Sequence, residues 1–410
     1  MKQIPGGVTA PKGFRAWGVH CGVKSKKADK KDLALILSDQ ECAAAAVYTM
    51  NRVKAAPLYV TMEHLEDGTA WGVAANSGNA NACCPMSHEY AEEMARLAAR
   101  ATGRAPADFV VASTGVIGQT LNIAAIRAGM PAAAAGLTAG PEGSDAAARA
   151  IMTTDTCPKH GSVSFSGGGI GYPGVTFTVG GMCKGAGMIM PNMATMIAVI
   201  TTDAPIAAPD LSQALTVAVS KSFNKVTVDS DTSTNDTCFA LASGAAAPEG
   251  PAFTPGTPAF DAFQRALDQL ATTLARKMAA DGEGATRLIT VTVRGAATAD
   301  DADAAARTVA NSPLVKTAVY GHDANWGRVA AALGRSGARF NQEDVDIDIL
   351  GLPVCRAGLV VDFDEEEALR RFEEPEVAIE VDLHAGEESA TMWTCDFSHE
   401  YVTINGDYRS

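Results

Sequence analysis

The chain has 410 residues, of which 47% are hydrophobic and 20% charged, a balance typical of globular rather than disordered proteins. Its 33 lysines and arginines face 47 aspartates and glutamates, which gives a formal net charge of −14 at pH 7. This acidity argues against a nucleic-acid or anionic-membrane surface and favours a cytoplasmic protein that handles small molecules. The first residues contain no apolar signal-peptide core, and no uninterrupted apolar run approaches about 18 residues, so we expect neither a signal peptide nor a transmembrane helix.

In the first half of the chain, the clearest signals are glycine-rich breaks. Gly136–Ser144 is predicted to be a loop, because glycine, proline and small polar residues follow one another there. Gly169, Gly171 and Gly174 have the spacing of a dinucleotide-binding loop, but strand-like residues follow where that motif needs a helix. We therefore interpret these glycines as part of a hairpin region.

The second half contains a long helix followed by strands. A loop is predicted at Gly244–Pro258, and apolar residues at steps of three and four after it predict an amphipathic helix. Those residues are Phe260, Phe263, Leu267, Leu270, Leu274 and Met278. Leu288–Val293, Val345–Ile349 and Val377–Leu383 alternate as strands, the last two with one acidic face, as in antiparallel sheets. Asp362–Glu367 is interpreted as a solvated helix start. The fold class is therefore α/β or α+β.

Common catalytic and metal-binding motifs are missing from the sequence. There is no G-x-S-x-G elbow for a Ser-His-Asp triad, no P-loop, no H-E-x-x-H and no His/Cys pair at ligand spacing, so no metal is expected. Nine cysteines without C-x-x-C spacing favour a reducing compartment. Gly180–Asp203 stands out as a glycine-rich turn carrying Lys184, followed by Thr195 at the start of an apolar run. On spacing alone, Thr195 is most simply a packed residue of a buried strand or helix.

Lys184–Ala204 (KGAGMIMPNMATMIAVITTDA) resembles the signature of the ornithine acetyltransferase (glutamate N-acetyltransferase) family. The resemblance covers essentially the whole chain, because further segments follow the family's order. They are Thr9–Phe14, Gly22–Lys24, Asp32–Ala34, Tyr48–Pro57, Asn76–Cys83, Ser113–Gly118, Met152–Lys159, Val226–Thr237, Asp281–Leu288, Lys316–Gly337 and Tyr401–Ser410. Ser230 in place of the usual glycine and Cys84-Pro85 in place of Thr-Gly depart from the family pattern.

The resemblance implies a self-cleaving, N-terminal-nucleophile-like architecture with layered sheets flanked by helices. Cleavage between Ala194 and Thr195 gives an α chain of residues 1–194 and a β chain of residues 195–410, and the family implies an α2β2 assembly. The freed α-amine of Thr195, with an ordinary pKa of about 7.7–8.0, then serves as the base for its own hydroxyl. This role would explain why no catalytic histidine stands out.

The implied activity is a ping-pong transfer of acetyl from N-acetylornithine to glutamate in arginine biosynthesis, through acetyl-Thr195 and without a cofactor. Acetyl-CoA stays open as a second acetyl donor. The resemblance places Thr114 and Gly115 at the oxyanion hole. Its substrate-binding positions carry over to Thr153 or Thr154, Lys184, Thr195, Glu283, Asn405 and Ser410. We assign Lys184 to a substrate carboxylate and Glu283 to an ammonium group, and the cluster His322–Arg328 to the scaffold.

Two other functions stay open. A related N-terminal-nucleophile amidase or aminopeptidase would share the Thr195 chemistry but pass the acyl group to water. An uncleaved amino-acid-binding protein would keep the binding residues without the chemistry, although the intact signature disfavours it.

Overall fold

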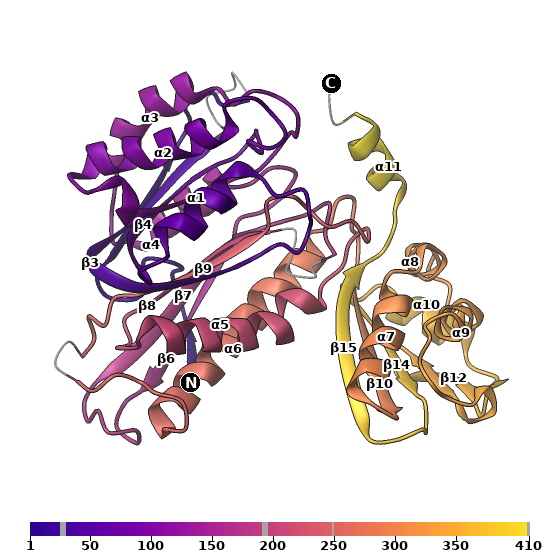
Figure 1. The fold of residues 1–410 in the computed structure, drawn as a ribbon. Coiled ribbons are helices and arrows are strands. Elements are labelled where there is room, and N and C mark those ends of the chain that lie inside the picture. The colour runs from indigo at the N-terminus through magenta and orange to yellow at the C-terminus, as the bar shows by residue number, and fades with distance from the viewer. Residues whose placement is uncertain (25–29, 191–195, 248–249, 408–410) are drawn as a thin grey trace. The chain divides into compact units, whose positions relative to one another are not determined.

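The computed structural model describes residues 1–24, 30–190, 196–247 and 250–407, and the chain divides into two compact units (Figure 1). Unit 1 comprises the described residues within Met1–Gly185, Pro191–Asn224 and Thr232–Leu274. Unit 2 comprises those within Ala186–Met190, Lys225–Asp231 and Ala275–Ser410. Both units combine a sheet with helices, which confirms the mixed α/β class and the prediction of sheets flanked by helices.

Unit 1 is built on a nine-stranded sheet in the order β1-β6-β7-β8-β9-β3-β4-β5, with β2 also paired to β3. The strands are β1 Lys2–Ile4, β2 Phe14–Val19, β3 Leu33–Tyr48, β4 Thr69–Asn76, β5 Phe109–Ser113, β6 Lys159–Ser166, β7 Thr176–Lys184, β8 Ile197–Thr202 and β9 Thr237–Ala242. Most neighbours are antiparallel, but β4–β5 and β8–β9 are parallel.

The long strand β3 joins the two halves of this sheet. Its pairing with β4 shifts register between Leu37 and Cys42, and its last residues, Ala43–Tyr48, pair with β9. Leu33, Leu35 and Leu37 enter one apolar core with α2 and α3, whereas the alternate residues enter a second core with β7, β8 and β9. Because both faces of the strand are buried, its sequence reads as a continuous apolar run.

The helices of unit 1 cover the sheet from outside, with α2 and α3 on one side and α5 on the other (Figure 1). They are α1 Ala56–His64, α2 Ser87–Thr102, α3 Ile123–Ala135, α4 Pro141–Ala150 and α5 Ala208–Lys221, with short 3-10 turns at Pro106–Asp108 and Phe223–Lys225. The helix α6, Pro258–Ala280, begins in unit 1 and ends in unit 2. Its Leu274 approaches Gly181 of β7 so closely that a Cβ there would lie 3.1 Å away.

Unit 2 contains a six-stranded sheet in the order β13-β12-β11-β14-β10-β15. The strands are β10 Leu288–Ala296, β11 Asp346–Ile349, β12 Leu352–Arg356, β13 Leu359–Val360, β14 Glu376–Asp382 and β15 Glu388–Cys395. The helices are α7 Ala299–Ala310, α8 Pro313–Tyr320, α9 Trp326–Gly334, α10 Glu365–Arg371 and α11 His399–Gly406, with a 3-10 turn at Gln342–Asp344. Alternate residues of β10, β11 and β14 pack with α7 in one apolar core.

The regular elements of the second half confirm the sequence predictions. The amphipathic pattern corresponds to α6, with Pro258 as its first residue, a position where proline's missing N–H costs nothing. The three alternating segments are β10, β11 and β14, and the acidic segment starts α10 with Asp364 as its N-cap. The glycines at 169–174 lie between the paired strands β6 and β7, so the hairpin interpretation is confirmed.

Two predictions were wrong in part. The Gly136–Ser144 loop ends at Gly140, because Pro141 starts α4 and the following residues are helical. The antiparallel prediction holds for β14 with β11, but β14 is parallel to β10, from Leu288 opposite Glu376 onward. Alternation of apolar and polar residues indicates that one face of a strand is buried. It does not determine whether a neighbouring strand runs parallel or antiparallel.

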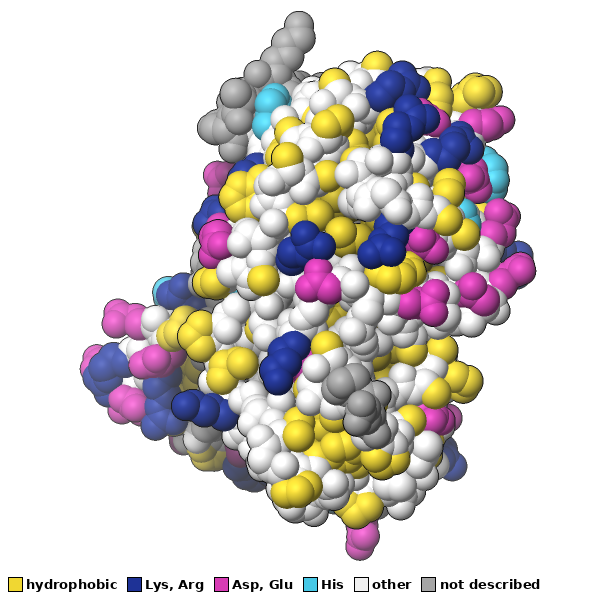
Figure 2. Space-filling model, turned by 90° about the vertical axis from the view of Figure 1, so that its left-hand side faces the viewer, with side chains coloured by type: hydrophobic (Ala, Val, Ile, Leu, Met, Phe, Trp, Pro, Cys, Tyr) yellow, Lys and Arg dark blue, Asp and Glu magenta, His cyan; other side chains and the backbone are white. Residues whose placement is uncertain are grey.

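The surface carries charges of both signs. On the face drawn in Figure 2, lysine and arginine side chains lie among aspartate and glutamate side chains and exposed apolar ones. Among the described residues, no helix has the length and apolar character needed to cross a bilayer.

Candidate active site

Three of the predicted site residues, Ala194, Thr195 and Ser410, lie outside the described residues. The residues that follow Thr195 are held by hydrogen bonds to neighbouring strands. Met196 accepts a hydrogen bond from the Thr237 amide at 2.9 Å, and β8 begins at Ile197. Ile197 lies opposite Lys184 of β7 on one side and Thr237 of β9 on the other. Two neighbouring strands therefore fix the backbone two residues after the predicted nucleophile.

Lys184 is the last residue of β7 rather than part of a glycine-rich turn, so that interpretation was wrong. The glycines before it, Gly180 and Gly181, are strand residues. A Cβ on Gly180 would lie 2.0 Å from the Gly7 carbonyl oxygen, so glycine is required there by close backbone approach. The Lys184 side chain is buried, with 6% of its surface exposed.

Lys184 belongs to a buried ionic cluster centred on Asp155. The Asp155 carboxylate lies 2.6 Å from Lys159 Nζ and 4.0 Å from Lys184 Nζ, and it accepts hydrogen bonds from the Gly185 and Thr153 amides at 2.7 and 3.0 Å. Burial raises the pKa of Asp155, but the Lys184 and Lys159 charges and the hydrogen bonds outweigh it and hold that pKa well below its ordinary value. Asp155 is therefore ionised in the folded protein.

A second buried carboxyl group, Asp236, behaves in the opposite way. Complete burial raises the pKa of Asp236 well above its ordinary value, against the lowering effects of the Met196 amide and the Lys184 charge. Among the described residues, its Oδ2 has no hydrogen-bond partner. Burial thus drives Asp236 toward its uncharged form. Asp236 also contacts the backbone of Met196, the residue directly after Thr195.

Thr153 and Thr154 lie in the turn between α4 and β6, and both are partly buried. The Thr153 amide is tied to Asp155, so this turn is part of the same cluster as Lys184. The structure thus brings Thr153 and Lys184 together through one carboxylate.

Thr114 and Gly115 follow β5 directly. The Thr114 amide donates to the Asn76 carbonyl at 3.0 Å, whereas its hydroxyl makes no hydrogen bond with any described residue. Gly115 has a φ of +133°, and a Cβ there would lie 2.3 Å from the Gly78 carbonyl carbon, so only glycine fits. Asn235 holds this segment by donating to the Ser113 carbonyl at 2.8 Å.

In unit 2, Glu283 and Asn405 are joined by a hydrogen bond of 2.8 Å from Asn405 Nδ2 to Glu283 Oε2. Glu283 is buried, and its carboxyl group lies against Gly187, where a Cβ would come within 2.3 Å of its Cδ. Asn405 belongs to α11, which Ser398 anchors by a 2.6 Å hydrogen bond to the Gly284 carbonyl. The structure therefore brings these two predicted residues into contact.

The His322–Arg328 cluster has contacts of a structural kind. The His322 ring stacks on Phe372 with ring centroids 5.6 Å apart, and Asn325 caps α9 by accepting the Arg328 amide at 3.1 Å. Arg328 donates to the Leu314 carbonyl at 2.8 Å. These contacts agree with a scaffold role.

The two buried aspartates were not among the site residues predicted from the sequence. Asp155 and Asp236 both lie in segments that matched the family, Met152–Lys159 and Val226–Thr237, so the signal was present. The role of both aspartates depends on their burial near Lys184. No residue close to either of them in the sequence indicates that this contact forms.

A sequence profile of the ArgJ family matches residues 15–410. The arginine biosynthesis bifunctional protein ArgJ of Symbiobacterium thermophilum is 52% identical over 411 residues, and that of Caldanaerobacter subterraneus subsp. tengcongensis is 45% identical over 415 residues; both alignments cover 100% of each chain. The crystal structure of the arginine biosynthesis bifunctional protein argJ of Bacillus halodurans is 43% identical, with a TM-score of 0.50. That similarity covers 51% of this chain and 98% of the solved one.

Replacing Asp155 by asparagine should destabilise the protein at pH 7 by about 3–5 kcal/mol, because the carboxylate that pairs with two buried ammonium groups is lost. The pKa of Asp155 is lowered by folding, so its contribution is full above the unfolded value of about 3.9 and is lost as the pH falls through the folded value. The free-energy gap between wild type and Asp155→Asn, measured by urea unfolding, should therefore narrow only below about pH 4.

The matched control is Asp145→Asn, which removes another aspartate with a basic residue four positions later. The Asp145–Arg149 pair is 2.7 Å long but exposed, so its loss should cost at most about 1 kcal/mol. Equal effects of the two substitutions would contradict the assignment of Asp155 to a buried ionic cluster.

Proposed function

The chain belongs to the ArgJ family of arginine biosynthesis acetyltransferases, and we propose that it transfers acetyl from N-acetylornithine to glutamate through an acetyl group on Thr195. The observation that carries the proposal is the end-to-end identity of 52% with a bifunctional ArgJ protein. The signature around Lys184 and Thr195 lies within the matched residues.

The first step of the proposal is cleavage before Thr195. The Thr195 hydroxyl attacks the Ala194 carbonyl carbon, the peptide C–N bond breaks, and the amine takes a proton, which leaves an ester on Thr195. Water then hydrolyses the ester to the Ala194 carboxylate and the free hydroxyl. Chain lengths support this step: curated relatives match this chain from end to end, whereas the solved Bacillus halodurans chain corresponds to about half of it.

The freed α-amine of Thr195 then acts as the base in transfer. It takes the hydroxyl proton while Thr195 attacks the acetyl carbon of N-acetylornithine, and this proton passes to the departing ornithine amine. The amine of glutamate attacks acetyl-Thr195 in the second half-reaction, which releases N-acetylglutamate. No cofactor takes part in either half.

Charge balance around Lys184 suits it to a substrate carboxylate. Two ammonium groups, those of Lys159 and Lys184, face the ionised Asp155, while Asp236 is driven toward its uncharged form. Lys184 therefore brings a buried cationic group to this part of the site, which supports an anionic ligand there. Thr153 or Thr154 would add a hydroxyl donor from the adjoining turn.

Glu283 is proposed to bind an ammonium group of the substrate. Its carboxyl group is buried and makes a hydrogen bond to Asn405, but no described lysine or arginine forms an ion pair with it. Asn405 would orient this carboxylate, and Ser410 is proposed to contribute from the residues beyond α11.

Thr114 and Gly115 are proposed to stabilise the tetrahedral oxyanion of both half-reactions. No described residue forms a hydrogen bond with the Thr114 hydroxyl, which supports this role, because a donor directed at developing charge must not be occupied by another acceptor. The glycine that follows it has no side chain to obstruct the approach.

Further parts of the proposal concern the assembly and the second donor. The bifunctional name of the relatives supports acetyl-CoA as a second acetyl donor.

The two chains are proposed to form an α2β2 assembly in the cytoplasm. β8 and β9 follow the cleavage point and hydrogen-bond to β7 and β3, which precede it, so cleaved chains would stay together.

The function is tested with N-acetylornithine labelled in its acetyl group. Purified protein should convert glutamate to labelled N-acetylglutamate and release ornithine in equal amount; acetyl-CoA is supplied separately as the second donor. An amidase would instead release labelled acetate at a rate that glutamate does not change. That result would overturn the transferase and favour the hydrolase.

Thr195→Ala should give a single uncut chain without transfer activity, because the nucleophile of both reactions is removed. Intact-mass spectrometry of the wild type should show two fragments, the second beginning with Thr195. Thr195→Ser, which keeps a hydroxyl, is the matched control and should retain some cleavage. A wild-type chain that stays full length and yet transfers acetyl would rule out the mechanism.

Thr114→Ala should lower kcat by about 10²–10³ with a smaller change in KM, as expected when one oxyanion donor is lost. Thr114→Ser keeps the hydroxyl and should stay close to wild type. Steady-state kinetics of both variants separate the hydroxyl from the methyl group, and an unchanged kcat in Thr114→Ala would remove this side chain from the mechanism.

A further inference from the structure

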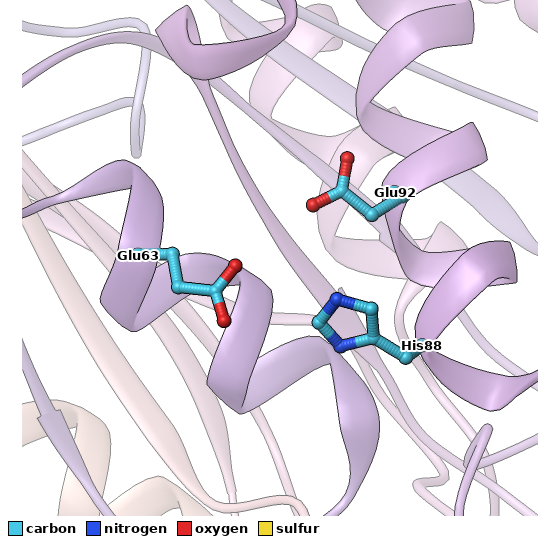
Figure 3. A group of neighbouring side chains, drawn as sticks. All are labelled: Glu63, His88 and Glu92. Carbon is cyan, nitrogen blue, oxygen red and sulfur yellow. The ribbon is translucent and has the colours of Figure 1, made fainter.

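Two helices of unit 1 bring three metal-ligating side chains together, far from Lys184 in sequence. Glu63 comes from the last turn of α1, and His88 and Glu92 lie one turn apart on α2. One ligand atom of each side chain lies within 4.8 Å of the others. Figure 3 shows the imidazole of His88 beside the two carboxylates.

Among the described residues, two of the three side chains of this cluster have no polar partner. The side chains of Glu63 and His88 make no hydrogen bond or ion pair with any described residue. The neighbouring cation is Arg96, whose Nη1 lies 3.5 Å from Glu92 Oε2 on an exposed surface. Two carboxylates held this close repel each other, and a bound cation between them would relieve that repulsion.

A fourth side chain lies next to the cluster on its buried side. His64, only 10% exposed, places Nδ1 2.7 Å from the Phe109 carbonyl oxygen and Nε2 3.8 Å from Glu92 Oε1. A carbonyl oxygen can only accept, so His64 Nδ1 donates this hydrogen bond. His64 therefore lies beside Glu92 as a neighbour of the three side chains and is not one of them.

The helices that carry the cluster are fixed in place. Thr61 of α1 accepts the Val111 amide and donates to the Val111 carbonyl of β5, both at 2.9 Å. The Nδ1 contact of His64 with Phe109 ties the end of the same helix to the same strand. The end of α1 that carries Glu63 is therefore held against β5.

We propose that Glu63, His88 and Glu92 bind a divalent transition-metal ion of the Zn²⁺ type. One imidazole and two carboxylates form a nitrogen–oxygen set suited to zinc with three protein ligands, whereas calcium and magnesium prefer oxygen ligands alone. The ion joins α1 to α2 and is a site separate from acetyl transfer. The site therefore stands or falls independently of the proposed function.

The test uses the full-length protein after treatment with a chelator. Calorimetric titration with Zn²⁺ should show one ion bound per copy of residues 1–194 and a rise in Tm, because a ligand of the folded state stabilises it. His88→Ala and Glu92→Gln should each weaken binding by at least about tenfold and abolish the rise in Tm, while acetyl transfer stays unchanged. Urea unfolding without metal checks that both variants fold.

His384→Ala is the matched control, because His384 also lies between two carboxylates, 3.1 Å from Asp346 and 3.5 Å from Asp382, but in unit 2. It should bind Zn²⁺ as the wild type does. Co²⁺ absorption supplies a second readout, since thiolate ligands give a charge-transfer band that this nitrogen–oxygen set does not. Absent binding, a thiolate spectrum, or binding that survives both α2 substitutions would overturn the proposal.

Discussion

The insertion of β8 between β7 and β9 is the constraint on which the rest of the site depends. Because β8 begins at Ile197, opposite Lys184 and Thr237, it aligns three segments that are distant in sequence. One brings the lysine of the signature, one brings Asp236, and the third is the chain that leaves Thr195. The sheet register, rather than any loop, thus determines which side chains surround the start of β8.

Burial and local contacts favour different protonation states for two chemically identical side chains, those of Asp155 and Asp236. Asp155 has two ammonium partners and two backbone donors, which outweigh the cost of burying its charge. Asp236 interacts with the Lys184 charge but is more deeply buried. The effect of burial on its pKa is therefore the larger one and favours the protonated acid. Lys184 thus lies near one carboxyl group that folding keeps ionised and one that burial drives toward its uncharged form.

The sequence predicted the periodic elements and the family, but not the contacts. The helix at 258–280 and the strands β10, β11 and β14 follow from spacing, because burial of one face imposes that spacing on the residues. The spacing of buried residues does not predict that β14 lies parallel to β10. Likewise Glu283 and Asn405 were assigned by resemblance, whereas their hydrogen bond across 122 positions depends on tertiary packing. Glu63 and His88 lie on separate helices, so no spacing in the sequence predicts their proximity either.

The covalent boundary proposed before Thr195 does not coincide with a boundary of the fold. Unit 1 contains residues from both sides of that position, and β8 and β9 lie inside its sheet, paired to β7 and β3. Six registered residue pairs join β8 to β7, and six more join β9 to β3. A cut at this point would therefore release a new amine without releasing a domain, since the hydrogen bonds and apolar contacts of the sheet remain. The fold can form as one chain and keep its core after becoming two, which is what a nucleophile made by cleavage requires.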